Sequence, residues 1–474
     1  MQRRKSSFAL NVIKGAAMII VLLSALGAFA QTAGTLSVLW DFGTVSSYDG
    51  NSPVCNGVVF DTKGNLYGAT DWGGANGAGV VFELTPPSQA GGSWSESLLY
   101  SFDPNSTTFN DGSTPCGSLA IDAAGNLYGT TLLGGTNGTG TVWKLSPPAA
   151  GSTSWTETVL HSFGAAGSGD GFSPFAGVTL ASSAATTLYG TTLCGGTGPA
   201  AGAYGYLETF GLYGCSNGSG TVYELSYKKP TKTVKGGWTE TVLYSFAANS
   251  STDGALPMGA LALKGKDLYG VTTEGGVDAS NGAAFCSVAS GNGTYGCGIA
   301  YELQPGTKGW TETVLYNFGA TATDSANPLQ MTPVIVDNNI YGTAAGGGTD
   351  NDSGTFWELV YSSSTQSYSE QVLSSFAGAP NWQLVEGKNA NIWYGAAASG
   401  EYTVGSLVEL AYIKPTKKVT GGWTETTLYQ FTAGSDGGIP NYNELIKDKS
   451  GNLYGMNNLG GGDQFIGNVF EFQP

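Results

Sequence analysis

Short apolar runs of strand length alternate along the chain with turn residues, chiefly glycine, proline, asparagine and aspartate. Four consecutive runs near the start of the pattern occupy residues 54–60, 65–70, 79–84 and 94–102. Threonine, tyrosine, valine and tryptophan, which favour pleated surfaces, are frequent in them. No segment keeps apolar residues at a sustained helical period with capping residues. The pattern therefore predicts an all-β protein with few helices.

These runs belong to a unit of about 60 residues that recurs seven times. Each unit reads P-x-x-G-x-L-x-x-D, then G-N-L-Y-G-T-T, then G-T-V-x-E-L, then W-T-E-T-V-L-Y-S-F, with variations. Successive Tyr-Gly pairs lie 61, 61, 80, 72, 53 and 60 residues apart. Four antiparallel strands repeated radially predict a β-propeller, whose architecture leaves only short strand edges exposed. The tyrosines of the seven pairs are Tyr67, Tyr128, Tyr189, Tyr269, Tyr341, Tyr394 and Tyr454.

The two ends of the repeat region complement one another. Residues 36–42 match the fourth strand of a unit, and residues 468–472 match the third strand of the last unit, which has no fourth. The predicted fold is an all-β, seven-bladed β-propeller of four-stranded antiparallel blades, closed by the N-terminal strand pairing with the C-terminal blade. We expect residues 31–474 to form this single domain, with blades at 43–102, 103–163, 164–246, 247–318, 319–376, 377–431, and 432–472 plus 35–42.

A family resemblance rests on the same repeat. The string Gly125-Asn126-Leu127-Tyr128-Gly129-Thr130-Thr131 is followed by Gly134-Gly135 and by Gly138-x-Gly140-Thr141-Val142. This resembles the tandem repeat of the choice-of-anchor GloVer proteins, over essentially the whole chain after residue 30. The resemblance implies an exported bacterial repeat protein, and it implies no particular activity.

Residues 1–30 have the organisation of a secretory signal peptide. Four cations precede residue 15, residues 16–28 are apolar, and an A-x-A cleavage site ends at Ala30. The apolar run is shorter than the roughly 20 residues of a membrane span. We expect Sec-type export to the outside or the cell surface of a bacterium, with no membrane span after cleavage. The alternative is an uncleaved N-terminal anchor.

The charge balance argues against one class of partner. Removing residues 1–30 takes away four cations and no acids, which changes the net charge from −16 to −20 and leaves lysine as the only basic residue besides His161. Nucleic-acid backbones are bound by clustered cations, so we expect no nucleic-acid partner. We also expect a monomer and no cofactor.

The six cysteines of an exported chain indicate disulfides. Cys55 and Cys116 occupy the same position in neighbouring repeats, and the other four flank or lie in two insertions. The simplest pairing is Cys55–Cys116, Cys194–Cys215 and Cys286–Cys297. Free thiols or a metal site are the alternatives, although no histidine accompanies these cysteines.

Two long insertions, residues 193–219 and 274–296, interrupt the loop between the second and third strands of adjacent units. We expect them side by side on one face of the ring, each held by its own disulfide. Their aromatic rings suit stacking against sugars or apolar peptide side chains; alternatively, the rings pack within their own loops. The predicted ligand-binding residues are Trp72, Tyr204, Tyr206, Phe210, Tyr213, Phe285 and Tyr295.

Two lysine-rich segments, residues 227–237 and 413–422, connect the third and fourth strands of their units. Such hairpin tips are usually solvated and protect strand edges, but they also suit an anionic partner. Asp-Gly pairs that precede a proline, such as Asp111-Gly112, are interpreted as turns rather than calcium sites.

Catalytic residues are not evident in the pattern. His161, the single histidine, replaces a tyrosine of the repeat, so we interpret it as a substituted structural position. The repeated glutamates, such as Glu157, also suit a structural role. Only acids outside the repeat, such as Glu208, Glu274 and Asp278, could supply the two carboxyl groups that sugar chemistry needs. We therefore expect no catalytic and no metal-binding residues.

The sequence favours a secreted, non-catalytic propeller that binds a glycan or an extracellular protein through the insertion-bearing face. One alternative is an extracellular carbohydrate-active hydrolase or lyase, which would need acids at the centre of the ring. A second is a structural cell-surface protein that assembles through its lysine-rich hairpins.

Overall fold

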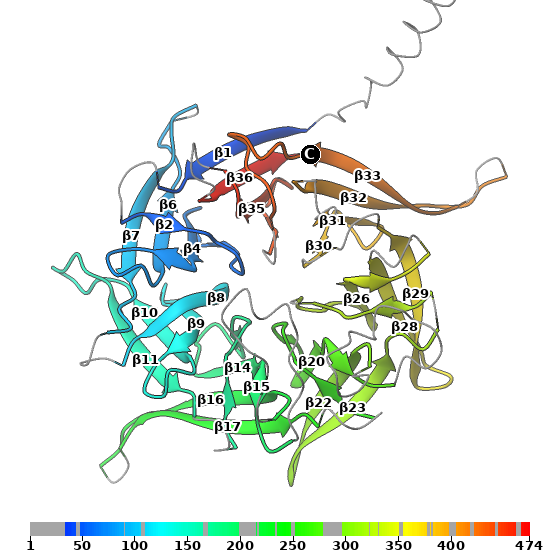
Figure 1. Cartoon of the computed structure of the whole chain (residues 1–474), viewed down its shortest axis with the longest axis horizontal. Helices are drawn as coiled ribbons and strands as arrows, with labels where there is room; N and C mark the ends of the chain where they lie inside the picture. The colour runs from blue at the N-terminus through cyan, green and yellow to red at the C-terminus, as the bar shows by residue number, and fades with distance from the viewer. Residues whose placement is uncertain are drawn as a thin grey trace, which may run out of the picture.

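The repeated apolar runs form seven four-stranded antiparallel sheets arranged as blades around a central axis (Figure 1). The first strand of each blade lies nearest the axis and the fourth lies at the rim. The structure, a computed structural model, describes residues 34–43, 48–89, 91–105, 110–164, 169–198, 215, 218–232, 235–247, 252–277, 296–321, 323–329, 331–349, 354–376, 380, 383–397, 404–417, 421–440, 444–460 and 466–474. Within these segments there is no helix, and so none long and apolar enough to cross a membrane.

Each blade contributes four strands, numbered in chain order. Blades 1 and 2 contain β3 (Val59–Phe60), β4 (Leu66–Thr70), β6 (Val80–Thr85), β7 (Ser95–Ser101), β8 (Gly112–Ile121), β9 (Leu127–Gly134), β10 (Thr141–Ser146) and β11 (Thr156–Ser162). Blades 3 and 4 contain β13 (Thr179–Leu180), β14 (Thr187–Thr192), β16 (Thr221–Lys228), β17 (Gly237–Ser245), β19 (Ala262–Lys264), β20 (Asp267–Val271), β22 (Ile299–Gly306) and β23 (Gly309–Asn317). Blades 5 and 6 contain β25 (Val334–Val336), β26 (Asn339–Ala344), β28 (Thr355–Ser362), β29 (Ser367–Ser375), β30 (Val385–Glu386), β31 (Ile392–Ala397), β32 (Ser406–Ile413) and β33 (Gly422–Gln430). Blade 7 contains β34 (Ile446–Lys447), β35 (Leu453–Asn457), β36 (Asn468–Gln473) and β1 (Thr35–Asp41).

The ring closes through its two ends. Strand β1 pairs antiparallel with β36, from Thr35 opposite Gln473 to Asp41 opposite Asn468. The N-terminal strand therefore supplies the fourth strand of the last blade, as the sequence predicts. The expected signal segment, residues 1–30, lies outside the described residues.

The Tyr-Gly repeat has a packing explanation. In blade 1, Gly68 is the cross-strand partner of Phe82 on the third strand. A Cβ added at Gly68 would lie 2.5 Å from the Phe82 ring, and one added at Gly129 would lie 2.4 Å from the ring of Trp143. Only glycine leaves room for the third-strand ring to lie flat across its own sheet.

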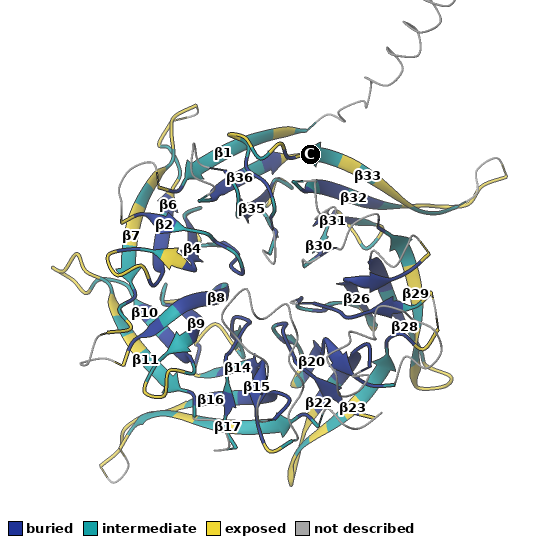
Figure 2. Ribbon diagram, in the orientation of Figure 1, coloured by how far each residue is buried: buried dark blue, intermediate teal, exposed yellow. Residues whose placement is uncertain are grey.

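Aromatic residues also join neighbouring blades. A buried phenylalanine follows each fourth strand. Phe163, for example, is fully buried and makes an edge-to-face contact with Tyr223 on the third strand of the next blade, with ring centres 5.2 Å apart. Such pairs favour this geometry and bury large apolar areas. Burial is accordingly concentrated between the blades, while the fourth strands at the rim are partly exposed (Figure 2).

Candidate functional site

The insertion-bearing face is built from two kinds of connection that bond to each other. Loops between blades and loops between second and third strands form short antiparallel pairs. In blade 3, β12 (Gly171–Phe172) pairs with β15 (Cys194–Gly195), and in blade 4, β18 (Gly254–Ala255) pairs with β21 (Glu274–Gly275). The same pairing occurs at β2 (Gly50–Asn51) with β5 (Trp72–Gly73), and at β24 (Ser325–Ala326) with β27 (Gly346–Gly347). Both insertions therefore start from hydrogen-bonded strand pairs in adjacent blades.

Disulfides hold this region. Cys194 is bonded to Cys215 across the first insertion, and both are buried. Cys297, at the end of the second insertion, is also disulfide-bonded, and its expected partner Cys286 lies outside the described residues. Cys55 is bonded to Cys116 with a sequence separation of 61, which ties blade 1 to blade 2. Among the described residues there is no free cysteine.

Trp72 is the one predicted ligand-binding residue that the described segments include. It lies in β5 and 52% of its surface is exposed. The other predicted aromatic residues lie outside the described residues, so the structure does not place them; they are Tyr204, Tyr206, Phe210, Tyr213, Phe285 and Tyr295.

A buried acid lies at the root of the second insertion. Glu274 is 6% exposed, and its Oε2 atom has no hydrogen-bond partner among the described residues. Burial raises the pKa of this carboxyl to about 7. Two further acids named from the sequence, Glu208 and Asp278, lie outside the described residues. Glu274 is thus a carboxyl shielded from solvent in β21, where the second insertion begins.

Polar groups from several blades meet at the centre of the ring. Thr332 of blade 5 donates a hydrogen bond of 3.3 Å to Glu444 of blade 7. A Cβ added at Gly57 of blade 1 would lie 2.3 Å from the Ser118 hydroxyl and 3.0 Å from Glu444. These four residues share one position of the repeat, where a small side chain is usual. Burial raises the pKa of Glu444, and the hydroxyls of Ser118 and Thr332 oppose that rise.

A second buried acid near the axis belongs to blade 1. Asp71 is 1% exposed and accepts a hydrogen bond of 2.6 Å from the Asn56 amide. Burial raises its pKa, while hydrogen bonds from the backbone of Val54 and Cys55 and from Asn56 lower it. Acids are therefore present towards the axis, but each is held by neighbouring protein groups.

The Asp-Gly pairs and the repeated glutamates come together between blades. The Tyr100 hydroxyl of blade 1 donates a 2.8 Å hydrogen bond to Asp111, which lies in the linker to blade 2. The Asp111 carboxylate also accepts hydrogen bonds from the backbone N–H groups of Asp103 and Gly112. Burial, and then the charge of Asp111, raise the pKa of Glu157 in β11 to about 8. This boundary thus combines a tyrosine, a linker aspartate and a glutamate of the next blade.

The proximity of a linker aspartate and a fourth-strand glutamate recurs at other boundaries. Burial raises the pKa of Glu96 to about 9, with the nearby Asp49 adding to the effect. The interpretation of these glutamates as unpaired structural residues is therefore incomplete, because each of five has an aspartate as neighbour. Twist of the fourth strand brings together groups that lie far apart in sequence. The pairs are Asp49 with Glu96, Asp111 with Glu157, Asp170 with Glu240, Asp253 with Glu312, and Asp324 with Glu370.

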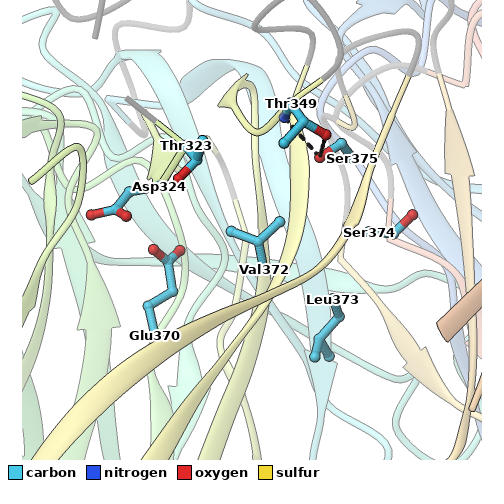
Figure 3. Close-up of a pocket in the computed structure, with 8 residues that line it drawn as sticks. All are labelled: Thr323, Asp324, Thr349, Glu370, Val372, Leu373, Ser374 and Ser375. Atoms are coloured by element: carbon cyan, nitrogen blue, oxygen red, sulfur yellow. Dashed lines mark hydrogen bonds between the residues drawn. The ribbon is translucent and has the colours of Figure 1, made fainter. Parts of the chain in front are cut away.

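One of these pairs lines a surface pocket of ≈ 510 Å³ formed by blade 5 and the linker that leads into it (Figure 3). The carboxyl groups of Asp324 and Glu370 lie at one end of it, where the Tyr316 hydroxyl donates to both, at 3.0 and 3.3 Å. Thr349 and Ser375 supply hydroxyls at the other end. Because the acid pair repeats at other boundaries, its presence here follows from the architecture.

The boundary between blades 2 and 3 departs from this pattern. His161 replaces the tyrosine, and its Nε2 atom lies 3.1 Å from Asp170 Oδ2. Glu240 completes the group from β17. The substitution at His161 is evident from the sequence, but its two acidic neighbours were not predicted. Both acids belong to motifs that the sequence shows, the Asp-Gly pair and the repeated glutamate. That they lie close to His161 follows only from the geometry of the blades.

The lysine-rich segments form hairpins that project from the rim of the ring (Figure 1). Tyr227 packs on Trp238 at the base of one, and Tyr412 packs on Trp423 at the base of the other, with ring centres 5.4 and 5.5 Å apart. These cross-strand aromatic contacts stabilise the extended hairpins.

Comparison with known proteins identifies the repeat. Residues 26–204 match the Gloeobacter/Verrucomicrobia repeat, which confirms the resemblance inferred from the sequence over that segment. No curated protein matches the chain.

Several solved structures are similar to this chain at low sequence identity. An oxidoreductase (glucose dehydrogenase) of Thermus thermophilus is 14% identical, with 93% of this chain and 100% of that chain covered and a TM-score of 0.41. The PQQ-bound aldose sugar dehydrogenase of Streptomyces coelicolor is 10% identical, with 80% and 98% covered and a TM-score of 0.38. The endosialidase of phage phi92 is 12% identical, with 93% and 68% covered and a TM-score of 0.41. These similarities are too distant to bear on function.

Proposed function

We propose that this protein is an exported binding module that recognises a glycan or another extracellular protein through its insertion-bearing face. The observation that carries the proposal is the pair of long insertions that start from hydrogen-bonded strand pairs in adjacent blades. Loops held by a rigid scaffold are where proteins commonly place binding residues.

The disulfides support order at this face. A cross-link that closes a loop of about 20 residues, as Cys194–Cys215 does, lowers the entropy of the unfolded chain by the equivalent of about 3 kcal/mol. An ordered loop loses less conformational freedom when a ligand binds. Disulfides are also typical of proteins outside the cytoplasm, which agrees with export.

The exposed ring of Trp72 supports an aromatic platform for the ligand. A tryptophan that is 52% exposed on a loop face is available for stacking against a sugar or an apolar side chain. Aromatic residues of this kind often contribute most of the binding energy at an interface. The six aromatic residues of the insertions extend the same platform in this proposal.

The acids of the ring do not favour the hydrolase or lyase alternative. Asp71 is almost completely buried, and the paired acids between blades recur with the repeat. A glycosidase needs two carboxyl groups that reach the same glycosidic bond. Burial accounts for Asp71 and repetition accounts for the paired acids, so neither requires a substrate.

A glycan array combined with capture of partners from native cell envelope tests the proposal. We expect binding that the Trp72→Ala substitution weakens about tenfold. The matched control is Ile413→Ala, which removes an apolar side chain that is 41% exposed on a lysine-rich hairpin. A second variant replaces residues 197–218 with the short loop of blade 2, residues 136–138, and changes Cys194, which would lose its partner, to the matching leucine of blade 2; it should lose binding while the ring stays folded. Wild-type protein that binds neither glycans nor envelope proteins would contradict the proposal.

A further inference from the structure

The boundary between blades 2 and 3 brings three metal-ligating side chains together. They come from three separate elements: His161 from β11, Asp170 from the linker, and Glu240 from β17. One ligand atom from each lies within 4.8 Å of the other two, and the closest pair, His161 Nε2 and Asp170 Oδ2, is 3.1 Å apart. The side chains of His161 and Asp170 are 21% and 18% exposed, so the group is sheltered but reachable from solvent.

Two polar atoms beside this cluster lack partners in the described part of the protein. The Oε1 atom of Glu240 is buried and accepts no hydrogen bond. The hydroxyl of Tyr223 is also buried without a partner, within the electrostatic range of both Glu240 and Asp170. The equivalent atoms of Glu312 and Tyr301 at the next boundary also lack partners among the described residues, so these two atoms belong to the repeat, and His161 is what distinguishes this place.

We propose that His161, Asp170 and Glu240 bind a divalent transition-metal ion, with Zn²⁺ as the ion that suits the site best. Zn²⁺ accepts imidazole nitrogen and carboxylate oxygen at about 2.0–2.2 Å, which places neighbouring tetrahedral ligands about 3.3 Å apart. The spacing of the three ligand atoms requires only small side-chain movements to meet that geometry. A nitrogen ligand favours Zn²⁺ and its neighbours over Mg²⁺ and Ca²⁺, which prefer oxygen. Two carboxylates balance the charge of the ion.

The neighbouring boundary provides an internal comparison. Between blades 3 and 4, Tyr244 stands where His161 stands, beside Asp253, Glu312 and the buried hydroxyl of Tyr301. The hydroxyl of Tyr244 hydrogen-bonds to Asp253 there. The two boundaries thus differ in the one residue that converts a hydrogen-bond donor into a metal ligand.

The site lies at the base of the first insertion. The carbonyl oxygen of Asp170 accepts a 3.0 Å hydrogen bond from the N–H of Gly196, where that insertion begins. Gly171, the next residue, pairs with Gly195. A bound ion therefore fixes blade 2, blade 3 and the start of the insertion relative to one another.

Metal binding can be measured on the full secreted chain after removal of any polyhistidine tag, since His161 is the single histidine. The protein is stripped with a chelator and titrated with Zn²⁺ by calorimetry, and with Co²⁺ by absorption spectroscopy. We expect one ion per chain and a Tm higher by about 3 °C when free Zn²⁺ exceeds Kd about a hundredfold.

Two substitutions exploit the internal comparison. His161→Tyr copies the boundary between blades 3 and 4, so it should fold normally and lose the ion together with the Zn²⁺-dependent rise in Tm. Tyr244→His copies the proposed site into the neighbouring boundary and should raise the stoichiometry from one ion to two. Stripped wild type that binds no Zn²⁺, or His161→Tyr protein that binds it as tightly as wild type, would show that His161 only replaces the tyrosine as a hydrogen-bond donor to Asp170.

Discussion

Replacing Glu157 with glutamine tests whether the carboxyl pairs between blades make stability depend on pH. Burial, and then the charge of Asp111, raise the pKa of Glu157 from 4.5 to about 8 in the folded protein. Because the folded pKa lies above the unfolded value, the stabilising contribution is complete below about pH 4.5 and is lost as the pH rises to about 8. We therefore expect the free energy of unfolding to fall from mildly acidic to mildly alkaline pH.

The size of the effect follows from the pKa change. At about 1.4 kcal/mol per pH unit, a pKa moved from 4.5 to about 8 corresponds to roughly 4–5 kcal/mol. Glu157 is partly exposed, and solvent screening reduces this value, so we expect about 2 kcal/mol. Glutamine keeps the shape of the protonated side chain but cannot ionise. When the pH is raised from about 5 to about 8.5, the free energy of unfolding of the variant should therefore fall by about 2 kcal/mol less than that of wild type.

Urea unfolding followed by tryptophan fluorescence at both pH values provides the measurement. Glu425→Gln is the matched control, because Glu425 occupies the same strand position, no aspartate is present in residues 376–384 before its blade, and burial alone raises its pKa. The Glu425→Gln substitution should therefore alter the pH dependence of the free energy of unfolding less than Glu157→Gln does. If the Glu157→Gln protein loses as much stability as wild type on going to alkaline pH, the proximity of Asp111 and Glu157 does not control the proton, and the reasoning fails.

Three further predictions concern the parts that hold the ring together. Replacing Cys55 and Cys116 together with serine should lower the free energy of unfolding by about 4 kcal/mol in urea without reductant, because the disulfide joins residues with a sequence separation of 61. Phe163→Ala should cost about 3–5 kcal/mol, because it removes a fully buried ring packed on Tyr223, whereas Phe163→Leu should cost clearly less in the same urea assay. Deleting residues 34–42 removes β1 and leaves β36 as an unpaired edge; we expect concentration-dependent association by light scattering, suppressed when a peptide of residues 34–42 is added, and a deletion protein that stays monomeric would contradict strand closure.

The repeat period was sufficient to predict the blades, because each unit carries its own packing rules. Glycine is needed at positions such as Gly68 and Gly129, because a third-strand ring lies against them. A buried phenylalanine such as Phe163 fills the space between two blades. The closure between β1 and β36 was predictable for a related reason. The last unit of the repeat contains three strands, and the first strand of the repeat region matches a fourth. Strand β1 therefore completes the last blade.

The candidate sites could be predicted only in part. The positions of the insertions follow from where the repeat is interrupted, and the pairing of Cys194 with Cys215 follows from their flanking one insertion. The exposure of Trp72 could not be read from its neighbours, because the same loop position could equally be covered by an insertion of another blade. Whether a ring faces solvent depends on side chains that are distant in sequence.

The sequence alone determined the strands, the number of blades and the way the ring closes, because these depend on local patterns repeated at a fixed spacing. The tertiary structure decided which charged groups meet. Asp170 and Glu240 are 70 residues apart, and Glu444 reaches Thr332 from another blade; only the twist of the blades and the curvature of the ring bring such groups within a few ångströms. Electrostatic interactions depend on these short distances, so the two acidic neighbours of His161 can be identified only from the tertiary structure.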